Sequence, residues 1–408
     1  MSCKLNVKQL IVPNYVKNFQ CKQCGRCCRR SWRIDIDKAT YLRVEQWYKE
    51  HNILEKLTEK VEADEKGWKI KFDAQNQCAY LTEDNRCGSQ LEMGEDYLSD
   101  TCKIYPRKIY ASSRGIEFSL YFSCPAAAEL LLQAAPVAFS QLDYGDANFD
   151  FMPPRCLSYY LPEKLPSSNI KRYYYMIESG LIQILQERRL TIKDRLFAIC
   201  QVCGRLEALD GTSQPPEVVS RAFSSISSMP IDTDYELHLS LLRQSFAPIM
   251  NAKREVRECA SFLFKILAMQ DTTGLALGIM KGAEGPMPLH AEVYRKQLEW
   301  YYSLTQENAN RVWENYFVNY IFSKEFYIAD WKTAIFKMML LRALIQFYAV
   351  ALQTLQPKAA PEQVLIQAIV EVDALISHSS LYVQDLCEDI QNNLGSRPLE
   401  LALNLAYA

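Results

Sequence analysis

The chain has 408 residues, of which 49% are hydrophobic, so it is long enough for two domains or for one domain with a large helical extension. This composition argues against a disordered chain. Lysine plus arginine (46) nearly balance aspartate plus glutamate (48), for a formal net charge of −2. The balance gives no overall reason to expect a nucleic acid or an anionic membrane as a partner.

The first residues, Met1-Ser-Cys-Lys-Leu-Asn-Val-Lys8, lack the apolar stretch and small-residue cleavage site of a secretory signal, so we expect a cytoplasmic protein. The most membrane-like segment is 334–355. Charged side chains such as Lys337 and Arg342 interrupt it, which favours a buried core helix and no membrane partner. We expect a monomer.

Residues 1–142 predict a cysteine-rich α+β module, small and irregular, stapled by metal. Alternation of apolar and polar residues predicts strands, and helical spacing of apolar residues predicts helices. The expected strands are 32–37, 67–72 and 115–122, and the expected helices are 38–51 and 126–141.

A stretch rich in Gly, Asp, Asn and Pro, at 143–154, predicts a domain boundary. Residues 155–408 then predict an all-helical domain, so the fold class is mainly α. The expected helices of this domain are 168–186, 191–210, 234–250, 254–269, 289–326, 330–355 and 361–392.

Eight of the fourteen cysteines lie between residues 21 and 124. In a reducing compartment, clustered cysteines hold metal or perform redox chemistry more often than they form disulfides. All four histidines lie outside the cysteine segments, so an all-sulfur site is expected. The candidate ligands are Cys21, Cys24, Cys27, Cys28, Cys78, Cys87, Cys102 and Cys124.

Four thiolates suit either zinc or an iron–sulfur cluster, and we favour an iron–sulfur cluster, of the [4Fe-4S] type, with zinc as the alternative. Eight thiols exceed the need of one cluster, so either four are spare or there are two sites. Cys27 and Cys28 are adjacent, and neighbouring side chains of an extended segment point to opposite sides, so we expect only one of them to face the metal.

Basic residues flank the first cysteines, Lys22, Arg26, Arg29 and Arg33 among them. They predict either compensation of the negative charge of a thiolate site or a docking surface for an acidic partner. A further CxxC pair, at Cys200 and Cys203, lies in a predicted helix and indicates core thiols rather than a redox pair.

The four cysteine segments, in this order, resemble those of the flagellin lysine N-methylase (FliB) family. Residues 95–107, 123–128 and 314–322 also resemble stretches of that family. The resemblance implies S-adenosylmethionine-dependent transfer of methyl groups to surface lysines of flagellin, in the cytoplasm, by a protein with an iron–sulfur cluster. The three-cysteine signature of radical S-adenosylmethionine enzymes is absent, so a structural or regulatory cluster is expected.

A lysine amine attacks only when it is neutral, and its ordinary pKa is about 10.4, so the site must desolvate it or lend it a base. Sulfonium groups bind to aromatic faces and oxygen dipoles. We therefore assign Tyr105, Tyr316 and Tyr320 as catalytic candidates, and Asn319 and Arg107 as cofactor-binding candidates, Arg107 for the cofactor carboxylate. No glycine-rich Rossmann loop is found.

A tyrosine stripe at helical spacing is also typical of a plain core. Two rival functions therefore stay open. One is a non-enzymatic, metal-stapled module that binds a protein partner, and the other is a redox-sensing iron–sulfur protein.

Overall fold

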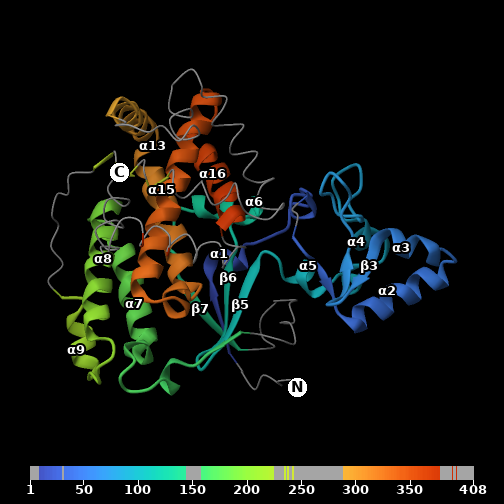
Figure 1. The fold of residues 1–408 in the computed structure, drawn as a ribbon, viewed down its shortest axis with the longest axis horizontal. Coiled ribbons are helices and arrows are strands. Elements are labelled where there is room, and N and C mark those ends of the chain that lie inside the picture. The colour runs from blue at the N-terminus through green and yellow to red at the C-terminus, as the bar shows by residue number, and fades with distance from the viewer. Residues whose placement is uncertain are drawn as a thin grey trace.

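The computed structural model describes residues 9–29, 32–143, 158–224 and 288–376, a few positions between 234 and 242, and residues 388 and 392. Two hydrophobic cores organise these residues. Residues 27–104 form a lobe around the smaller core, and the other described residues form a body around the larger one. Figure 1 shows the lobe standing beside the body.

A five-stranded mixed sheet lies in the body. Its order is β7 (Phe139–Asp143), β1 (Gln9–Pro13), β6 (Gly115–Leu120), β5 (Arg107–Ser112) and β8 (Ser158–Tyr160). The pairs β1–β6 and β5–β8 are parallel, and the other two pairs are antiparallel. Every residue of β6 is buried, as expected for a central strand covered on both faces.

Gly115 begins β6, immediately after the turn that joins it to β5. It has a φ of +141°, and a Cβ there would lie 2.4 Å from the carbonyl oxygen of Gln9, so only glycine fits. The hairpin and the neighbouring strand β1 therefore depend on this position.

Long helices cover the sheet (Figure 1). They are α7 (Tyr174–Leu185), α8 (Ile192–Leu209), α13 (Pro288–Phe322), α15 (Trp331–Leu355) and α16 (Pro361–Ile376). Shorter elements are α1 (Asn14–Lys17), α6 (Pro125–Ala128), α9 (Pro216–Arg221), α14 (Glu325–Ile328) and the 3₁₀ turns η4 (Glu129–Leu132), η5 (Pro162–Lys164) and η6 (Ile170–Tyr173).

Capping side chains fix where two of the long helices begin. Thr191 accepts a hydrogen bond from the backbone N–H of Asp194, and Asp330 accepts one from the N–H of Thr333. Within α15, the window Trp331–Thr354 is long and apolar enough to cross a membrane, but 94% of it is buried inside the protein. It is a core helix, as the sequence predicted.

The lobe contains a small antiparallel sheet in the order β2 (Asp35–Ile36), β4 (Gly67–Ile70) and β3 (Val61–Asp64). Its helices are α2 (Lys38–Glu50), α3 (Leu57–Lys60), α4 (Gly88–Glu92) and α5 (Asp100–Ile104), with 3₁₀ turns η1 (Cys27–Arg29), η2 (Leu54–Lys56) and η3 (Glu95–Tyr97). The chain enters the lobe after α1 and leaves it after α5 (Figure 1).

The mainly α fold class is confirmed, and most predicted elements are found. The helix expected at 38–51 is α2, and those expected at 191–210 and 330–355 are α8 and α15. The strands expected at 67–72 and 115–122 are β4 and β6. The helices expected at 234–250 and 254–269, and the end of 361–392, lie largely outside the described residues.

Two predictions are wrong. The helix expected at 126–141 stops at Leu132, because Pro136 cannot continue it, and residues 139–143 instead pair with β1 as strand β7. The domain after residue 155 is not all-helical, because β8 joins the sheet beside β5.

The predicted boundary at 143–154 falls mostly outside the described residues and stays a prediction. The larger core contains apolar side chains from both sides of it, such as Ile116 of β6 and Leu344 of α15. Its sheet and helices therefore form one unit in the described part of the chain.

Candidate functional site

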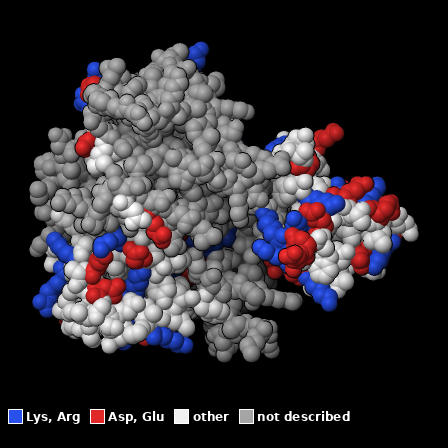
Figure 2. Space-filling view, viewed as in Figure 1, with Lys and Arg blue, Asp and Glu red and all other residues white. Residues whose placement is uncertain are grey.

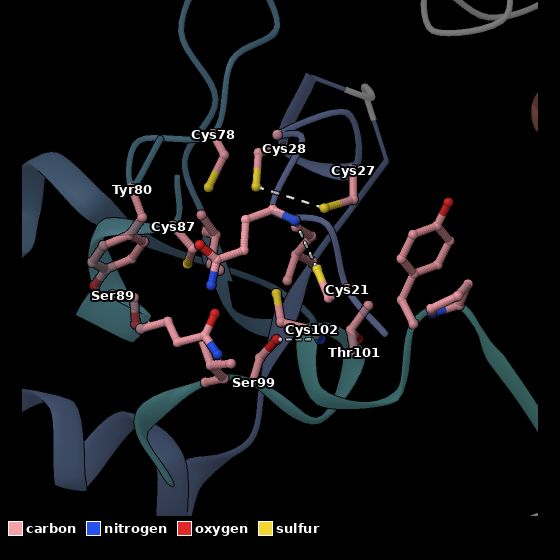
Figure 3. Close-up of a pocket in the computed structure, with 18 of the residues that line it drawn as sticks. Cys21, Cys27, Cys28, Cys78, Tyr80, Cys87, Ser89, Ser99, Thr101 and Cys102 are labelled. Carbon is pink, nitrogen blue, oxygen red and sulfur yellow. Dashed lines mark hydrogen bonds between the residues drawn. The ribbon is translucent and has the colours of Figure 1, made fainter. Parts of the chain in front are cut away.

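All eight candidate cysteines line one cavity of about 140 Å³ between the lobe and the body. Figure 3 shows the labelled thiols arranged around this common space. Its lining contains no His, Asp or Glu among the described residues, and the ligand role of the thiols stays a prediction. The lining cysteines are Cys21, Cys24, Cys27, Cys28, Cys78, Cys87, Cys102 and Cys124.

Cys27 and Cys28 both face this cavity, so the prediction that they point to opposite sides is wrong. They lie in the 3₁₀ turn η1, not in an extended segment, and their sulfurs are 3.8 Å apart. The carbonyl of Cys28 accepts a hydrogen bond of 2.7 Å from the N–H of Cys78, which fixes the second cysteine segment against the first.

Three of the other cysteines are placed by short helices, whereas Cys21 and Cys24 lie in a segment without regular secondary structure. Cys87 and Cys124 are the residues that precede α4 and α6, and Cys102 lies inside α5, where its N–H bonds to Ser99 Oγ at 3.2 Å. Segments far apart in sequence thus deliver thiols to one cavity, and these three lie just before a helix or in its first turn.

Gly25 allows the first cysteine loop to approach the segment 81–85. Its φ is +66°, and a Cβ would lie 2.8 Å from the carbonyl oxygen of Asn85. The side chain of Arg29 also donates to Asn85 Oδ1. Both contacts hold the loop that carries Cys21, Cys24, Cys27 and Cys28 against the lobe.

Burial disfavours the charged form of these thiols. It raises the pKa of Cys102 to about 12 and that of Cys124 to about 11. A hydrogen bond with Cys28, together with burial, raises the pKa of Cys27 still further. These three thiols are therefore neutral by themselves, and a bound metal cation would reverse this by stabilising the thiolates.

The chemistry of this donor set fits zinc or an iron–sulfur cluster. Among the described residues, however, no three Cys, His, Asp or Glu side chains converge closely enough to hold a metal ion. The residue types therefore fit a metal. The sulfur positions are not those of a closed site, because the thiols are spread over the wall of the cavity and do not surround one coordination point.

The basic residues that flank the first cysteines have acidic or amide partners within the chain. Lys22 pairs with Glu129, and Arg26 pairs with Glu371 of α16. Arg33 pairs with Asp64. Figure 2 shows Lys and Arg side chains interspersed with Asp and Glu over the visible face of the lobe. This arrangement favours charge compensation over a docking surface of one sign.

A second, smaller feature is a polar cleft of about 30 Å³ in the body. Glu325 lies within it, between Lys108 at 2.8 Å and Lys337 at 2.7 Å. Burial alone would raise the pKa of Glu325, but the two lysines outweigh it and lower this pKa to about 2. The lining residues are Lys108, Leu120, Tyr121, Phe122, Tyr316, Asn319, Tyr320, Ser323, Glu325, Lys337, Leu341 and Asp373.

The stretch 314–322 of α13, which resembles the FliB family, binds α13 to its neighbours through buried polar side chains. Glu314 is 1% exposed and pairs with Arg188 at 2.8 Å and Arg195 at 3.0 Å. The amide of Asn315 donates to the carbonyl of Leu131 at 2.9 Å. These contacts explain why polar residues occupy a helix at the centre of the core.

The predicted site residues fall into two groups. Tyr316, Asn319 and Tyr320 line the polar cleft, and Tyr105 lines the cysteine cavity. Arg107 lines neither; its guanidinium lies 5.2 Å from the ring centroid of Phe19, and burial lowers its pKa.

Two of the candidates in the cleft make hydrogen bonds to backbone. The side chain of Asn319 bonds to both the N–H (3.2 Å) and the C=O (3.0 Å) of Leu120, and it accepts from the hydroxyl of Tyr15. The hydroxyl of Tyr320 donates to the carbonyl of Ala334 at 3.0 Å. Both side chains therefore hold α13 against neighbouring elements while lining the cleft.

Hydrogen bonds connect the cavity with the cleft. Tyr105 and Ser123 share a hydrogen bond of 3.1 Å between their hydroxyls. The N–H of Ser123 donates to Asp373 Oδ2 at 2.8 Å, and the hydroxyl of Tyr316 makes a long hydrogen bond of 3.5 Å to Asp373 Oδ1. The two groups of predicted residues thus belong to one connected network.

The sequence analysis missed Asp373, Glu325 and Lys337. Asp373 carried a usable signal, because it occupies the apolar stripe of α16 that includes Ile366, Ile369 and Val370. An acidic residue on the buried face of a helix indicates a specific partner.

The fold and the site together define a mainly helical protein with a mixed sheet in its body and a thiol-lined cavity between the lobe and the body. A family model described as the FliB lysine N-methylase C-terminal domain matches residues 179–402, which is more than half of the chain. The chain therefore belongs to the FliB lysine N-methylase family.

Individual relatives agree with this family. Proteins named lysine-N-methylase, from Salmonella choleraesuis (strain SC-B67) and Salmonella typhimurium (strain LT2), are 30% identical over 132 residues, which is 29% of this chain and 31% of each relative. The match thus spans about a third of the length of these two relatives. The flagellar biosynthetic protein FliU of Salmonella muenchen is 30% identical over 131 residues, 29% of this chain and 75% of that protein. No solved structure matches the chain.

Proposed function

We propose that this protein transfers methyl groups from S-adenosylmethionine to lysine side chains of flagellin in the cytoplasm. The observation that carries the proposal is the match of residues 179–402 to the lysine N-methylase family. The names of the relatives, lysine-N-methylase and flagellar biosynthetic protein, support both the reaction and the substrate.

The cysteine cavity supports an iron–sulfur cluster as part of this proposal, with zinc as the alternative metal. All eight thiols, from Cys21 to Cys124, are available to it within one cavity. A cluster bound there would supply cross-links between the lobe and the first cysteine loop. We assign it this structural role.

The polar cleft is the proposed site for the lysine amine. S-adenosylmethionine would supply an electrophilic sulfonium methyl group; the amine lone pair forms the new N–C bond, and the electrons of the broken C–S bond stay on sulfur. The cleft of about 30 Å³ suits the end of a lysine side chain, since it holds little more than a water molecule.

Tyrosines would orient the reacting groups in this cleft. The phenols of Tyr316 and Tyr320 are 3% and 7% exposed, and burial raises the pKa of Tyr316, so it stays a neutral hydroxyl. Low exposure also favours the neutral form of an incoming amine. Positioning of this kind accounts for a large part of the rate of a simple displacement.

We assign Tyr105 and Arg107 to the methyl donor; Tyr105 lines the cavity, whereas Arg107 lines neither feature and lies against the cavity-lining Phe19. Tyr105 lines the cavity and forms a T-shaped ring pair with Trp32, at a centroid distance of 4.8 Å. Arg107 begins β5, directly after the segment that carries Tyr105. Its guanidinium would bind the carboxylate of the donor.

The test is methyl transfer by the protein purified under anaerobic conditions. It is incubated with flagellin and S-adenosylmethionine carrying a labelled methyl group, and modified lysines are located by mass spectrometry. We expect label on flagellin lysines, and none on flagellin whose lysines are acetylated beforehand. Iron and zinc analysis of the same sample identifies the metal.

Absence of transfer by protein that retains its metal would contradict the proposed function. That outcome would leave the two rival functions, a protein-binding module or a redox sensor. Stoichiometric zinc without iron would instead refute the iron–sulfur assignment and leave methyl transfer intact.

A further inference from the structure

We infer that Asp373 of α16 is a positioning residue that fixes the polar cleft to the cysteine cavity, so that the two act as halves of one site. This inference rests on the proposed function for its role in turnover. The relation between Asp373, Ser123 and Tyr316 rests on the geometry alone.

Asp373 lies where the two features meet. Its side chain is 6% exposed, and its two oxygens accept hydrogen bonds from different elements. Oδ2 accepts from the backbone N–H of Ser123, the residue before the cavity-lining Cys124, and Oδ1 accepts from the hydroxyl of Tyr316, which lines the cleft. One carboxylate therefore connects a residue of each feature.

A second contact brings the same helix to the first cysteine loop. Glu371, two residues before Asp373, pairs with Arg26, which lies between Cys24 and Cys27. Helix α16 thus contacts cysteine segments that are about a hundred residues apart in sequence. A displacement of either segment would be transmitted to α16, and through Asp373 to Tyr316.

The direction of the Tyr316 hydrogen bond gives Asp373 a role in the chemistry of the cleft. When the phenol donates its proton to Asp373, the lone pairs of its oxygen remain available to accept from a group in the cleft. A neutral lysine amine has N–H groups to donate to such an acceptor. The long distance of 3.5 Å is compatible with this role, because catalytic hydrogen bonds often tighten only when substrate binds.

The experiment compares three variants of the full chain with the wild type, all purified anaerobically. Asp373→Asn removes the charge, and Tyr316→Phe removes the hydroxyl. Glu362→Gln is the matched control, since it makes the same kind of change on the same helix, and neither Glu362 nor its hydrogen-bond partner Asn308 lines the cavity or the cleft.

The first measurement does not depend on activity. Hydrogen exchange of the Ser123 amide, and alkylation of Cys124 in metal-free protein, should both be roughly tenfold faster in Asp373→Asn than in the wild type, because the N–H loses a charged acceptor. Glu362→Gln should match the wild type. Unchanged exchange and alkylation in Asp373→Asn would overturn the inference.

The second measurement is the kinetics of methyl transfer. We expect kcat to fall roughly ten- to a hundredfold in Asp373→Asn and in Tyr316→Phe, with little change in KM for S-adenosylmethionine. The double variant should be no slower than the slower single variant, because both changes interrupt one hydrogen-bonded unit.

Multiplicative losses in the double variant, or an unchanged kcat in Asp373→Asn, would show that Asp373 serves only stability and would overturn the inference. If the wild type transfers no methyl group, the proposed function fails by itself. The exchange and alkylation rates then decide whether Asp373 ties the two features together.

Discussion

The lobe and the body are stabilised by different means. Among the described residues, the smaller core contains nine buried side chains, including Ile34, Val44 and Ile70, whereas the larger core continues through the sheet and the long helices. A core of the smaller size contributes little net stability after the loss of chain entropy, and small folds of this type are usually reinforced by metals or disulfides. The cysteine cavity is at the edge of the weaker region.

Charged groups show the same difference. In the body, Lys324 is fully buried and pairs with Glu117 at 2.7 Å and with Glu178, which also pairs with Arg114. The ion pairs of the lobe, such as that of Lys49 with Glu45, lie at its surface, where water screens them. The body therefore contains internal ion pairs, whereas the lobe has surface ion pairs and lies beside the cysteine cavity.

The largest expected effect is on the lobe when metal is removed. Chelation of the proposed metal, or Cys28→Ser, should abolish hydrogen-exchange protection of α2 and β4 while leaving that of α15 within a factor of a few. Structural metal sites contribute on the order of 10 kcal/mol to the folding of small domains. Peptide-resolved hydrogen exchange, with iron and zinc analysis, measures both regions in one sample.

Cys200→Ser is the matched control for this prediction. Cys200 is a fully buried core thiol of α8 and lines no part of the cavity. It should reduce the stability of the body by about 1–3 kcal/mol, the cost of burying a hydroxyl, with no loss of metal. Equal protection of the lobe with and without metal would contradict a metal-dependent lobe.

Lys324→Met should destabilise the body and leave the lobe unchanged. The substitution leaves Glu117 and Glu178 buried near each other with Arg114 still paired to both but without Lys324, which should cost about 3–5 kcal/mol. Urea unfolding of the body measures this loss, and the metal content should not change. Lys332→Met, which removes a surface pair with Glu207, should cost at most about 1 kcal/mol. Similar losses in both variants would argue against an internal network as a support of the body.

The cysteine cavity could be predicted from the sequence, because thiols are rare and metal chemistry requires them in groups. The turn at Cys27 and Cys28 could not, since spacing does not specify a 3₁₀ conformation. Strands β1 and β5 were missed because short segments such as Gln9–Pro13 are recognised by their partners in the sheet rather than by their own pattern.

Only some of the residues that line the polar cleft could be predicted from the sequence. Tyr316, Asn319 and Tyr320 share a helical face, so their proximity followed from spacing. Lys108 and Asp373 lie more than 260 residues apart in the chain, and only the tertiary fold brings them to one cleft. A single sequence contains no direct signal for such a pairing.

A smaller effect is expected on the stability of the protein at low pH, through the titration of Glu325. Its pKa in the folded state is about 2, below the ordinary value of 4.5, so its contribution is complete above about pH 4.5 and is lost as the pH falls towards 2. At about 1.4 kcal/mol per pKa unit, the wild type should lose about 3 kcal/mol of stability across this range through this group. Glu325→Gln should be less stable at neutral pH and should lack this part of the slope.

Glu187→Gln is the control for that measurement. The pKa of Glu187 is also about 2, because Arg189 donates hydrogen bonds to it, but this pair is exposed and should leave the pH profile almost unchanged. The midpoints of urea unfolding, measured between about pH 5 and about pH 2, give the pH dependence of the stability of each variant. Parallel profiles for Glu325→Gln and the wild type would contradict a buried charge at the cleft.

The smallest expected effect belongs to the cysteine loop. Gly25→Ala forces a side chain into the left-handed region, at φ +66°, and places a Cβ 2.8 Å from the carbonyl oxygen of Asn85. Together these should cost about 1–2 kcal/mol and accelerate metal release roughly 5- to 30-fold. Gly67→Ala, also at positive φ in the lobe but with no atom within 4 Å, should strain the backbone without disturbing the loop. Unfolding of the body should be unaffected in both variants. Equal rates of metal release from the two variants would mean that the contact with Asn85 does not hold the cysteine loop.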